Sequence, residues 1–358
     1  MPLRDVLIWI LAITSLVFLP LVVIQDLTGK RLRQGTAPIL VSGTILFLLV
    51  FCLWGRSLSF GVDTAGYAKV FAGYCNGQSM NDEQLSYFVT AWLLNAVMFG
   101  ACNVDWMPGA WGLLVVAPLL AMREPLPLRL SFAAVLIFSL VGIELTTNAL
   151  RQGVSVSVCM LAISVGRRNW VVGLPLAIMS VLLHTSTMLV FAALAFALLP
   201  WGLFVLALVG SIALVMQALQ SGLESAFLQP LLYEVQKYLA HESDELWVRV
   251  LGFACVVAAL VCPWLIRRHH DARLLTDKNY QIALRLAVAC LPFLALPYFG
   301  YRMLYGIYPL VLFFTLLSGC RTATPLGRHF ALLLIFNALV LLVWAQGSAA
   351  MRDLAFFD

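Results

Sequence analysis

The sequence predicts an all-α protein: a polytopic integral membrane bundle of about 10–12 transmembrane helices. Hydrophobic residues make up 62% of its 358 residues and charged residues only 11%, whereas soluble domains are about half apolar and a quarter charged. The apolar runs are continuous and extend from one end of the chain to the other. We therefore expect one transmembrane domain over residues 1–358, embedded in the lipid bilayer and without a soluble domain.

The expected spans are the apolar runs that approach the roughly 20 residues a helix needs to cross a bilayer. The first run has no small-residue cleavage site, so we interpret it as a retained helix rather than a signal peptide. The stretch 85–104 is apolar but contains Asn95 and Asn103, so we expect it to dip into the membrane without crossing. The spanning candidates are 6–24, 37–54, 107–122, 130–147, 150–166, 170–186, 187–199, 203–219, 247–266, 280–297, 303–318 and 329–346.

Charge sorts the loops into two groups. The positive-inside rule places the basic ones in the cytoplasm; they are 25–35, 123–129, 166–170, 267–278 and 320–328. The polar or acidic loops are then expected outside; they are 55–84, 146–149, 220–246 and 298–302. The formal charge of +5 lies in these arginine clusters, which we interpret as topology signals, so no nucleic-acid partner is expected.

Both long outer loops, 55–84 and 220–246, have helical patterns. In the first, Tyr67, Phe71 and Tyr74 form one aromatic face behind an N-cap at Asp63 or Thr64. In the second, leucines, a phenylalanine and a valine recur every four residues, which is typical of an amphipathic helix lying in the membrane interface.

The eight cysteines are scattered, mostly within apolar runs and without a C-x-x-C motif. We interpret them as small core residues, and the expected outer position of both Cys75 and Cys102 leaves one disulfide open. The sequence has no Cys/His metal box, P-loop or dinucleotide fingerprint, so neither a metal site nor a cofactor is expected.

Arg151 is the strongest pointer to function. It belongs to the polar sequence Thr146-Thr147-Asn148-Ala149-Leu150-Arg151-Gln152, which separates two apolar runs. A guanidinium near hydrocarbon is costly and is retained where water, an anion or a carboxylate receives it. Arg151 and His184 lie at similar distances on either side of the tip 166–168, so both should lie about 25 Å from it, at the outer membrane face.

Other ionisable residues are expected on the same side. Glu144 lies just below that face, Arg302 follows an outer turn, and the first outer loop contains Arg56, Asp63 and Glu83. Arginines gathered in this way form a natural pyrophosphate clamp, because their planar forks bind phosphate oxygens in pairs. Nearby carboxylates or a histidine could accept the proton of an attacking hydroxyl.

Each of these residues also has a structural explanation. Asp63 could serve only as an N-cap, Glu144 as the buried partner of Arg151, and His184 as a helix-end residue bonded to hydroxyls. Arg302 could extend to lipid headgroups, and the Tyr67 face could pack on the bundle instead of stacking on sugars. Two further sites are expected to have no catalytic role: Arg285 reaching inward to the membrane surface, and His269 with His270 in a basic loop.

The order of these short motifs resembles the EpsG family, a branch of the Wzy-type polysaccharide polymerases. The resemblance covers roughly residues 50–310 and departs from the family pattern at Glu83-Gln84-Leu85-Ser86-Tyr87. The matching positions are Arg56, Gly61-Val62-Asp63-Thr64-x-x-Tyr67, Glu83 ahead of Tyr87, Asn148-x-x-Arg151-Gln152, His184-x-Ser186 and Arg302-x-x-Tyr305.

The resemblance implies a GT-C-like membrane glycosyltransferase. Such an enzyme joins undecaprenyl-diphosphate-linked oligosaccharide units at the outer face of the bacterial inner membrane, with a chain-length regulator and a flippase as candidate partners. The resemblance implies that Arg151 and Arg302, with Arg56, bind the diphosphate. It implies that Asp63, Glu83 or His184 is the general base. Gln152 and Ser186 would position sugar or phosphate oxygens, with Tyr67, Glu144 and Tyr305 also at the substrate. An O-antigen-ligase-like enzyme and a lipid-linked sugar transporter remain alternatives.

Overall fold

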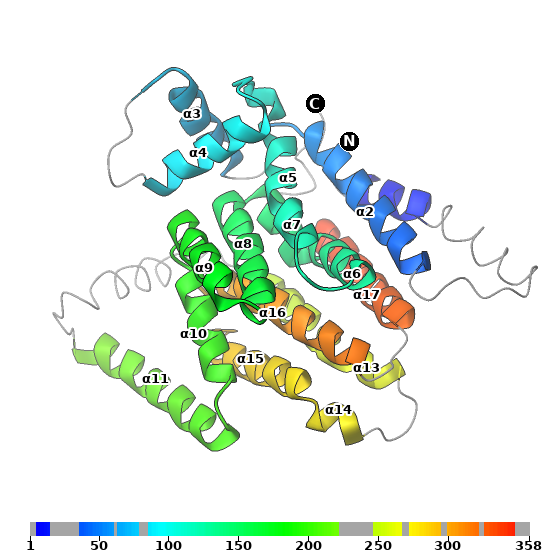
Figure 1. The fold of residues 1–358 in the computed structure, drawn as a ribbon, viewed down its shortest axis with the longest axis vertical. Helices are drawn as coiled ribbons and strands as arrows, with labels where there is room; N and C mark the ends of the chain where they lie inside the picture. Colours follow the sequence, from blue (N-terminus) through cyan, green and yellow to red (C-terminus); the bar gives the residue numbers. More distant parts are fainter. Residues whose placement is uncertain are drawn as a thin grey trace, which may run out of the picture. The chain divides into compact units, whose positions relative to one another are not determined.

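A computed structural model describes residues 5–14, 36–60, 63–78, 85–221, 246–266, 272–294, 299–321 and 326–347. Every regular element in these ranges is a helix and none is a strand, which confirms the predicted all-α class. The chain divides into two compact units, Met1–Thr187 with Gly319–Asp358, and Met188–Ser318, each described by itself below (Figure 1).

The first unit carries the polar sequence around Arg151. Besides a helix over Asp5–Thr14, its helices are α2 (Thr36–Trp54), α3 (Thr64–Cys75), α4 (Leu85–Val97), the short 3₁₀ turn η2 (Val104–Trp106), α5 (Met107–Leu120), α6 (Leu126–Ile137), α7 (Leu140–Thr147), α8 (Leu150–Gly166), α9 (Trp170–Leu183) and α17 (Leu326–Gly347). Helices α6, α7 and α8 are buried along most of their length. Close packing of α8 on α9 depends on Gly173, where a Cβ would lie 2.5 Å from the Cα of Gly166.

The second unit contains the remaining helices. They are α10 (Thr187–Ala197), α11 (Trp201–Ser221), α13 (Leu246–Ile266), α14 (Ala272–Thr276), α15 (Lys278–Leu294) and α16 (Phe299–Arg321). Arg285 on α15 donates to the carbonyl of Ala197 at the end of α10 (2.9 Å) and lies 5.0 Å from the ring of Trp201. Its charge therefore stabilises the C-terminus of α10.

The segment 130–147, predicted as one span, is two helices that meet at an angle of 77°. Ser139 makes the break: its hydroxyl donates to the carbonyl of Leu136 (2.6 Å) and accepts from the N–H of Gly142 (3.0 Å). A Cβ on Gly142 would lie 1.9 Å from that same carbonyl oxygen, so the bend requires glycine. Hydropathy alone cannot reveal such a bend, because both halves are equally apolar.

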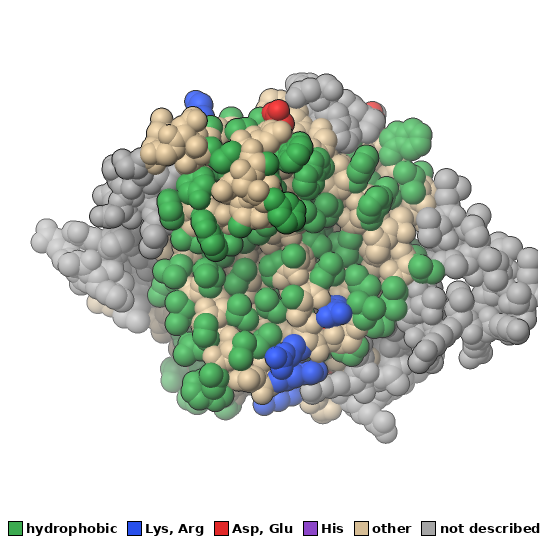
Figure 2. Space-filling model, turned by 45° about the horizontal axis from the view of Figure 1, so that its top comes forward, with side chains coloured by type: hydrophobic (Ala, Val, Ile, Leu, Met, Phe, Trp, Pro, Cys, Tyr) green, Lys and Arg blue, Asp and Glu red, His purple; other side chains and the backbone are tan. Residues whose placement is uncertain are grey.

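By length and composition, two helices within the described ranges can cross a membrane, at Val248–Leu265 and Arg302–Gly319, or three if α6 and α7 form one broken span. Nine further apolar helices have 10–17 residues there. Large hydrophobic side chains are exposed on many of them, and they cover much of the face in Figure 2. This is the pattern of a helical membrane protein, while the number of spans stays a prediction.

The stretch 85–104 forms no continuous helix. Helix α4 ends at Val97, and the following turn has positive φ at Phe99 (53°), Gly100 (80°) and Cys102 (48°). Thirteen residues of helix span about 20 Å, less than the roughly 30 Å hydrocarbon core. This agrees with a segment that does not cross. The expected interfacial helix in 220–246 lies outside the described residues, as do His269 and His270.

Loops predicted to share a side of the membrane do lie together in the first unit. At one end, buried Glu124 accepts a short hydrogen bond from Ser164, and its carboxylate lies 3.8 Å from the guanidinium of Arg167. The contact with Arg167 joins the basic loops 123–129 and 166–170. At the other end, Thr64 of the first long loop donates to the carbonyl of Thr147 (2.9 Å). The charge pattern therefore grouped these loops correctly.

Candidate anion site at the junction of α7 and α8

Two helices meet end to end around Arg151. Helix α7 stops at Thr147, where the N–H groups of Asn148 and Ala149 both bond the carbonyl of Glu144 (2.9 and 2.8 Å). Helix α8 starts at Leu150 behind Ala149, which has no side-chain cap to offer. The N–H groups of the first turn of a helix have no intrahelical acceptor and carry partial positive charge. The polar sequence thus presents a helix N-terminus as well as a guanidinium.

Two residues that sequence reasoning missed hold this junction. A Cβ on Gly153 would lie 2.1 Å from the carbonyl oxygen of Leu145, so α8 can fold back on α7 only with glycine here. From α5, the indole N–H of Trp111 donates to the carbonyl of Leu150 (2.8 Å). In the sequence, the packing role of Gly153 is indicated only by its position two residues after Arg151.

The guanidinium of Arg151 lies in a cage of neutral groups. It donates to the hydroxyl of Ser86 (2.7 Å) and lies 3.4 Å from the hydroxyl of Tyr67. Its carbon is 3.5 Å from the centre of the Tyr87 ring, so the planar group stacks on that ring. Tyr67 is in turn packed 5.3 Å from Trp111. Within the described residues, hydroxyls and aromatic rings surround this charge.

The cage leaves a net positive charge. Burial raises the pKa of Tyr67, and the charge of Arg151 lowers it in part, so the phenol stays neutral at pH 7. Its oxygen accepts from Arg151, which leaves its proton to donate to a ligand. Glu83, which precedes the cage residues Ser86 and Tyr87 in sequence, lies outside the described residues. A half-buried cation whose described hydrogen-bond and ring partners are all neutral is suited to binding an anion.

Arg56 provides a second cation beside the same junction. Its side chain is 3% exposed, and Nη1 donates to the carbonyl of Phe60, to Thr64 Oγ1 (3.2 Å) and to the carbonyl of Thr147 (3.5 Å). Its Nε and Nη2 have no hydrogen-bond partner among the described residues. Burial lowers the pKa to about 10, so the group is charged at pH 7, with donors left to satisfy.

Asp63 occupies the N-cap position of α3, as predicted, but its side chain makes no capping hydrogen bond with the described residues. Its carboxylate is exposed and close enough to Tyr67 to raise the pKa of that phenol. The structural explanation for an acid at this position is therefore weak. Asp63 is instead an accessible carboxylate at the start of α3, within electrostatic range of Tyr67.

Glu144 and Gln152 are the buried polar residues of the junction, 7% and 3% exposed. The Glu144 carboxylate accepts from the side-chain amide of Asn148 at 2.7 Å. Glu144 could be a direct partner of Arg151 or could contact the substrate. The bond to Asn148 does not distinguish these two roles. Its role stays a prediction.

His184 follows the last turn of α9 and is half-buried. Its Nδ1 accepts from the N–H of Ser186 (3.2 Å) and lies 2.7 Å from the Ser186 hydroxyl. A backbone N–H can only donate, so the lone pair of Nδ1 is occupied and the neutral ring carries its proton on Nε2. Ser155, one turn beyond Arg151 on α8, lies 3.5 Å from the His184 carbonyl, which places the two predicted residues at one end of the unit.

The aromatic face of α3 makes packing contacts, while sugar stacking by its half-buried tyrosines stays a prediction. Phe71 is buried and Tyr74 lies 5.5 Å from Phe88 of α4. Only Tyr67 reaches the arginine.

Arg302 and Tyr305 belong to the second unit. Both lie in the first turns of α16, Arg302 half-buried and Tyr305 buried. Arg302 is therefore helical rather than part of the expected outer turn, and a shared site with Arg151 stays a prediction.

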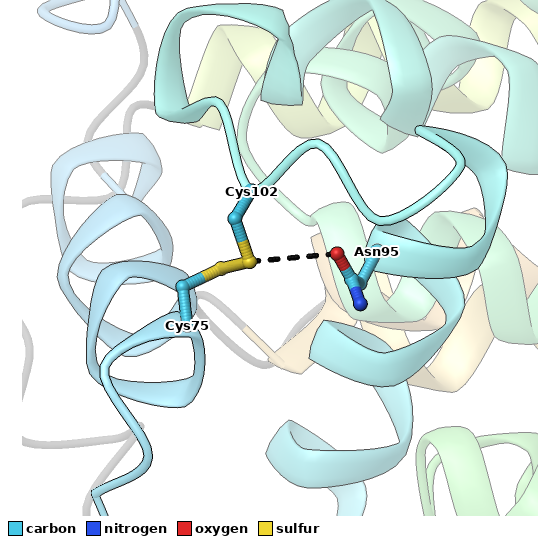
Figure 3. The surroundings of a disulfide bond; sticks show 3 residues. All are labelled: Cys75, Asn95 and Cys102. Atoms are coloured by element: carbon cyan, nitrogen blue, oxygen red, sulfur yellow. Dashed lines mark hydrogen bonds between the residues drawn. A yellow bond between two sulfur atoms is a disulfide. The ribbon is translucent and has the colours of Figure 1, made fainter.

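A disulfide closes the region that carries the cage. Cys75, the last residue of α3, is bonded to Cys102 in the turn that follows α4 (Figure 3). The side-chain amide of Asn95 lies 3.4 Å from Cys102 Sγ. The atom that faces the sulfur is the amide oxygen Oδ1, and because a disulfide sulfur has no hydrogen to donate, this is a packing contact rather than a hydrogen bond. The disulfide that the sequence analysis left undecided is therefore present. Within the described residues, five other cysteines are free thiols.

Comparison with known proteins adds one finding to this geometry. No match was found among curated proteins or among solved structures. The family model described as "EpsG family" matches residues 40–353, which is nearly the whole chain and includes both described arginine sites. The chain therefore belongs to the EpsG family.

Proposed function

We propose that this protein is a Wzy-type polysaccharide polymerase, a GT-C-like glycosyltransferase of the bacterial inner membrane. It would transfer a growing glycan from undecaprenyl diphosphate to the terminal sugar of a new lipid-linked repeat unit. The observation that carries the proposal is the EpsG match over residues 40–353. The geometry of the α7–α8 junction supports it, because the reaction needs a site for a diphosphate.

The charge of the leaving diphosphate would be held at the start of α8. Arg151 supplies a planar fork, the first turn of α8 supplies N–H groups and partial positive charge, and Arg56 has Nε and Nη2 unpartnered within the described residues. Donors fixed in advance and aimed at developing charge contribute several kcal/mol to transition-state stability. Tyr67 and Ser86 would keep Arg151 fixed before substrate arrives. Arg302 and Tyr305 stay candidate substrate-binding residues of α16.

Among the candidate bases, the geometry favours Asp63 over His184. The carboxylate of Asp63 is exposed and does not cap α3, so it can accept the proton of the attacking sugar hydroxyl. His184 has the lone pair of Nδ1 occupied by Ser186, so the ring would act as a donor through its Nε2 hydrogen rather than as a base. Glu83 stays a second candidate base, and Gln152 and Glu144 would contact substrate beside Arg151.

The disulfide supports an active site outside the cytoplasm. Disulfides persist in oxidising compartments and are rare in the cytosol, and Cys75–Cys102 joins the elements that carry Tyr67, Ser86 and Tyr87. The positive-inside rule assigns the same side independently, because the basic loops at 123–129 and 166–170 lie at the other end of α8.

The test is gel analysis of surface polysaccharide in a deletion strain complemented with wild type, Arg151→Ala or Arg168→Ala. Arg168 is the control, an exposed arginine at the opposite end of α8. Wild type and Arg168→Ala should restore the ladder of chain lengths, whereas Arg151→Ala should leave single repeat units while being inserted normally. A ladder that persists without the protein would refute polymerisation. Lipid-linked units retained on the cytoplasmic side would indicate transport, and loss of attachment with normal polymer would indicate a ligase.

A further inference from the structure

We propose that the Cys75–Cys102 disulfide is a positioning device for the anion site, so that phosphate binding and glycan transfer depend on an oxidised protein. This inference rests on the proposed diphosphate-binding role of Arg151. It adds a requirement for a partner of defined chemistry: a disulfide-bearing thiol oxidant that accepts two electrons from the two thiols as the bond forms.

The first step is where the bond lies relative to the cage. Helix α3 contributes Tyr67 and α4 contributes Ser86 and Tyr87, so every described contact of the Arg151 guanidinium comes from these two helices. The disulfide ties the end of α3 to the turn that follows α4. It therefore fixes the two elements whose relative position decides whether the cage closes on Arg151.

The second step is that the bonded turn is not one the chain prefers. Both Phe99 and Cys102 have positive φ (53° and 48°), a left-handed conformation that L residues rarely adopt. Phe99 is almost fully exposed, so packing does not hold it there. Backbone bonds from the N–H groups of Phe99, Gly100 and Ala101 hold the turn locally (3.1, 2.8 and 3.0 Å), and the disulfide is the covalent link that joins it to α3.

The third step separates positioning from folding. The first turn of α3 is fixed independently, because Thr64 donates to the carbonyl of Thr147, and Phe71 is buried within the unit. Tyr67 belongs to this fixed turn, so reduction should instead loosen α4, which carries Ser86 and Tyr87, relative to α3 without unfolding the bundle. A dithiol such as dithiothreitol delivers two electrons and two protons to the cystine, giving two thiols, and closes into its own cyclic disulfide.

The experiment measures inorganic pyrophosphate binding to the full-length protein in detergent, oxidised and reduced, for wild type, Cys75→Ser/Cys102→Ser, Arg151→Ala and all three substitutions together. Cys52→Ser, which removes a free, half-buried thiol of α2, is the control. We expect reduction to weaken pyrophosphate binding about tenfold in wild type and in Cys52→Ser, and the double serine variant to match reduced wild type. In the Arg151→Ala background, removing the disulfide should change binding no further.

Thermal unfolding completes the test. If the disulfide only stabilises the fold, reduction will lower the melting temperature and leave pyrophosphate affinity unchanged, which would overturn the inference. Equal weakening with and without Arg151 would also overturn it, because the effect would not pass through the cage. Disulfide-dependent pyrophosphate binding in a protein whose deletion leaves the polysaccharide ladder intact would refute the polymerase, and with it the dependence of glycan transfer, while the disulfide's role in anion binding would stand.

Discussion

Replacing Tyr87 by leucine should impair the enzyme by a predictable amount. The Tyr87 ring is 3.5 Å from the guanidinium carbon of Arg151, close enough for direct stacking. Such a contact contributes about 1 kcal/mol when exposed and about 2 kcal/mol when desolvated, and Arg151 is half-buried. With about 1.4 kcal/mol for each factor of ten, we expect kcat/KM of Tyr87→Leu to fall by about 5- to 30-fold.

The side-chain entropy of Arg151 sets an independent upper limit on the loss of kcat/KM, and this limit is of similar size. Without the ring, the arginine side chain must lose its rotamer freedom when substrate binds, and that freedom is worth about 2 kcal/mol. Since Ser86 still holds Nη1 at 2.7 Å, only part of this freedom returns. The loss should therefore not exceed about 30-fold.

The assay is the initial rate of chain extension by purified protein supplied with lipid-linked repeat units. Tyr87→Phe is the matched control, because it keeps the ring and removes only the hydroxyl, and it should stay within about twofold of wild type. Unchanged kcat/KM in Tyr87→Leu would refute the idea that the cage prepares Arg151. Equal damage in both variants, with equal melting temperatures, would show that the hydroxyl rather than the ring is what matters.

Three further outcomes follow from the geometry. Asp63→Asn should abolish chain extension without lowering the melting temperature. In contrast, Asp277→Ala, which removes a true cap of α15, should lower the free energy of unfolding by about 1 kcal/mol. Unimpaired extension by Asp63→Asn would show that Asp63 is not the base. Gly153→Ala should disrupt packing at the carbonyl 2.1 Å away, while Gly210→Ala, with open space around it, should be tolerated; equal expression and melting temperature of the two would contradict this. Arg285→Met should lower the melting temperature and leave kcat/KM unchanged, and reduced kcat/KM would indicate a role beyond binding the end of α10.

The helices could be predicted from the sequence because apolar runs between basic and polar loops are a strong signal. Helix α8 has the predicted bounds of 150–166, and α5 and α9 begin where expected, at residues 107 and 170. The break between α6 and α7 could not be predicted, since it depends on one serine and one glycine inside a uniformly apolar stretch. Of the loops grouped by charge, 123–129 and 166–170 lie together, as do 55–84 and 146–149, while the side of the membrane on which each pair lies stays a prediction.

The candidate site was only partly predictable. The polar sequence around Arg151 marked the junction, and depth counting placed His184 at the same end. The cage itself depends on contacts between residues that are 65 and 84 positions apart in sequence, and periodicity carries no such information. The aromatic face of α3 was recognised correctly, but its pattern could not distinguish packing from sugar binding, because both require the same side chains.

The neutrality of the cage is what separates a binding arginine from a structural one. A buried arginine that serves packing is usually paired with a carboxylate, because leaving the charge unpaired is costly. Here Glu144 is seven residues away in sequence, yet its carboxylate is bonded to Asn148, while Arg151 has a hydroxyl and two phenol rings as its described neighbours. Those neighbours hold the guanidinium in place without neutralising it. The charge is therefore kept available for an anion, as the proposed diphosphate-binding role of Arg151 requires.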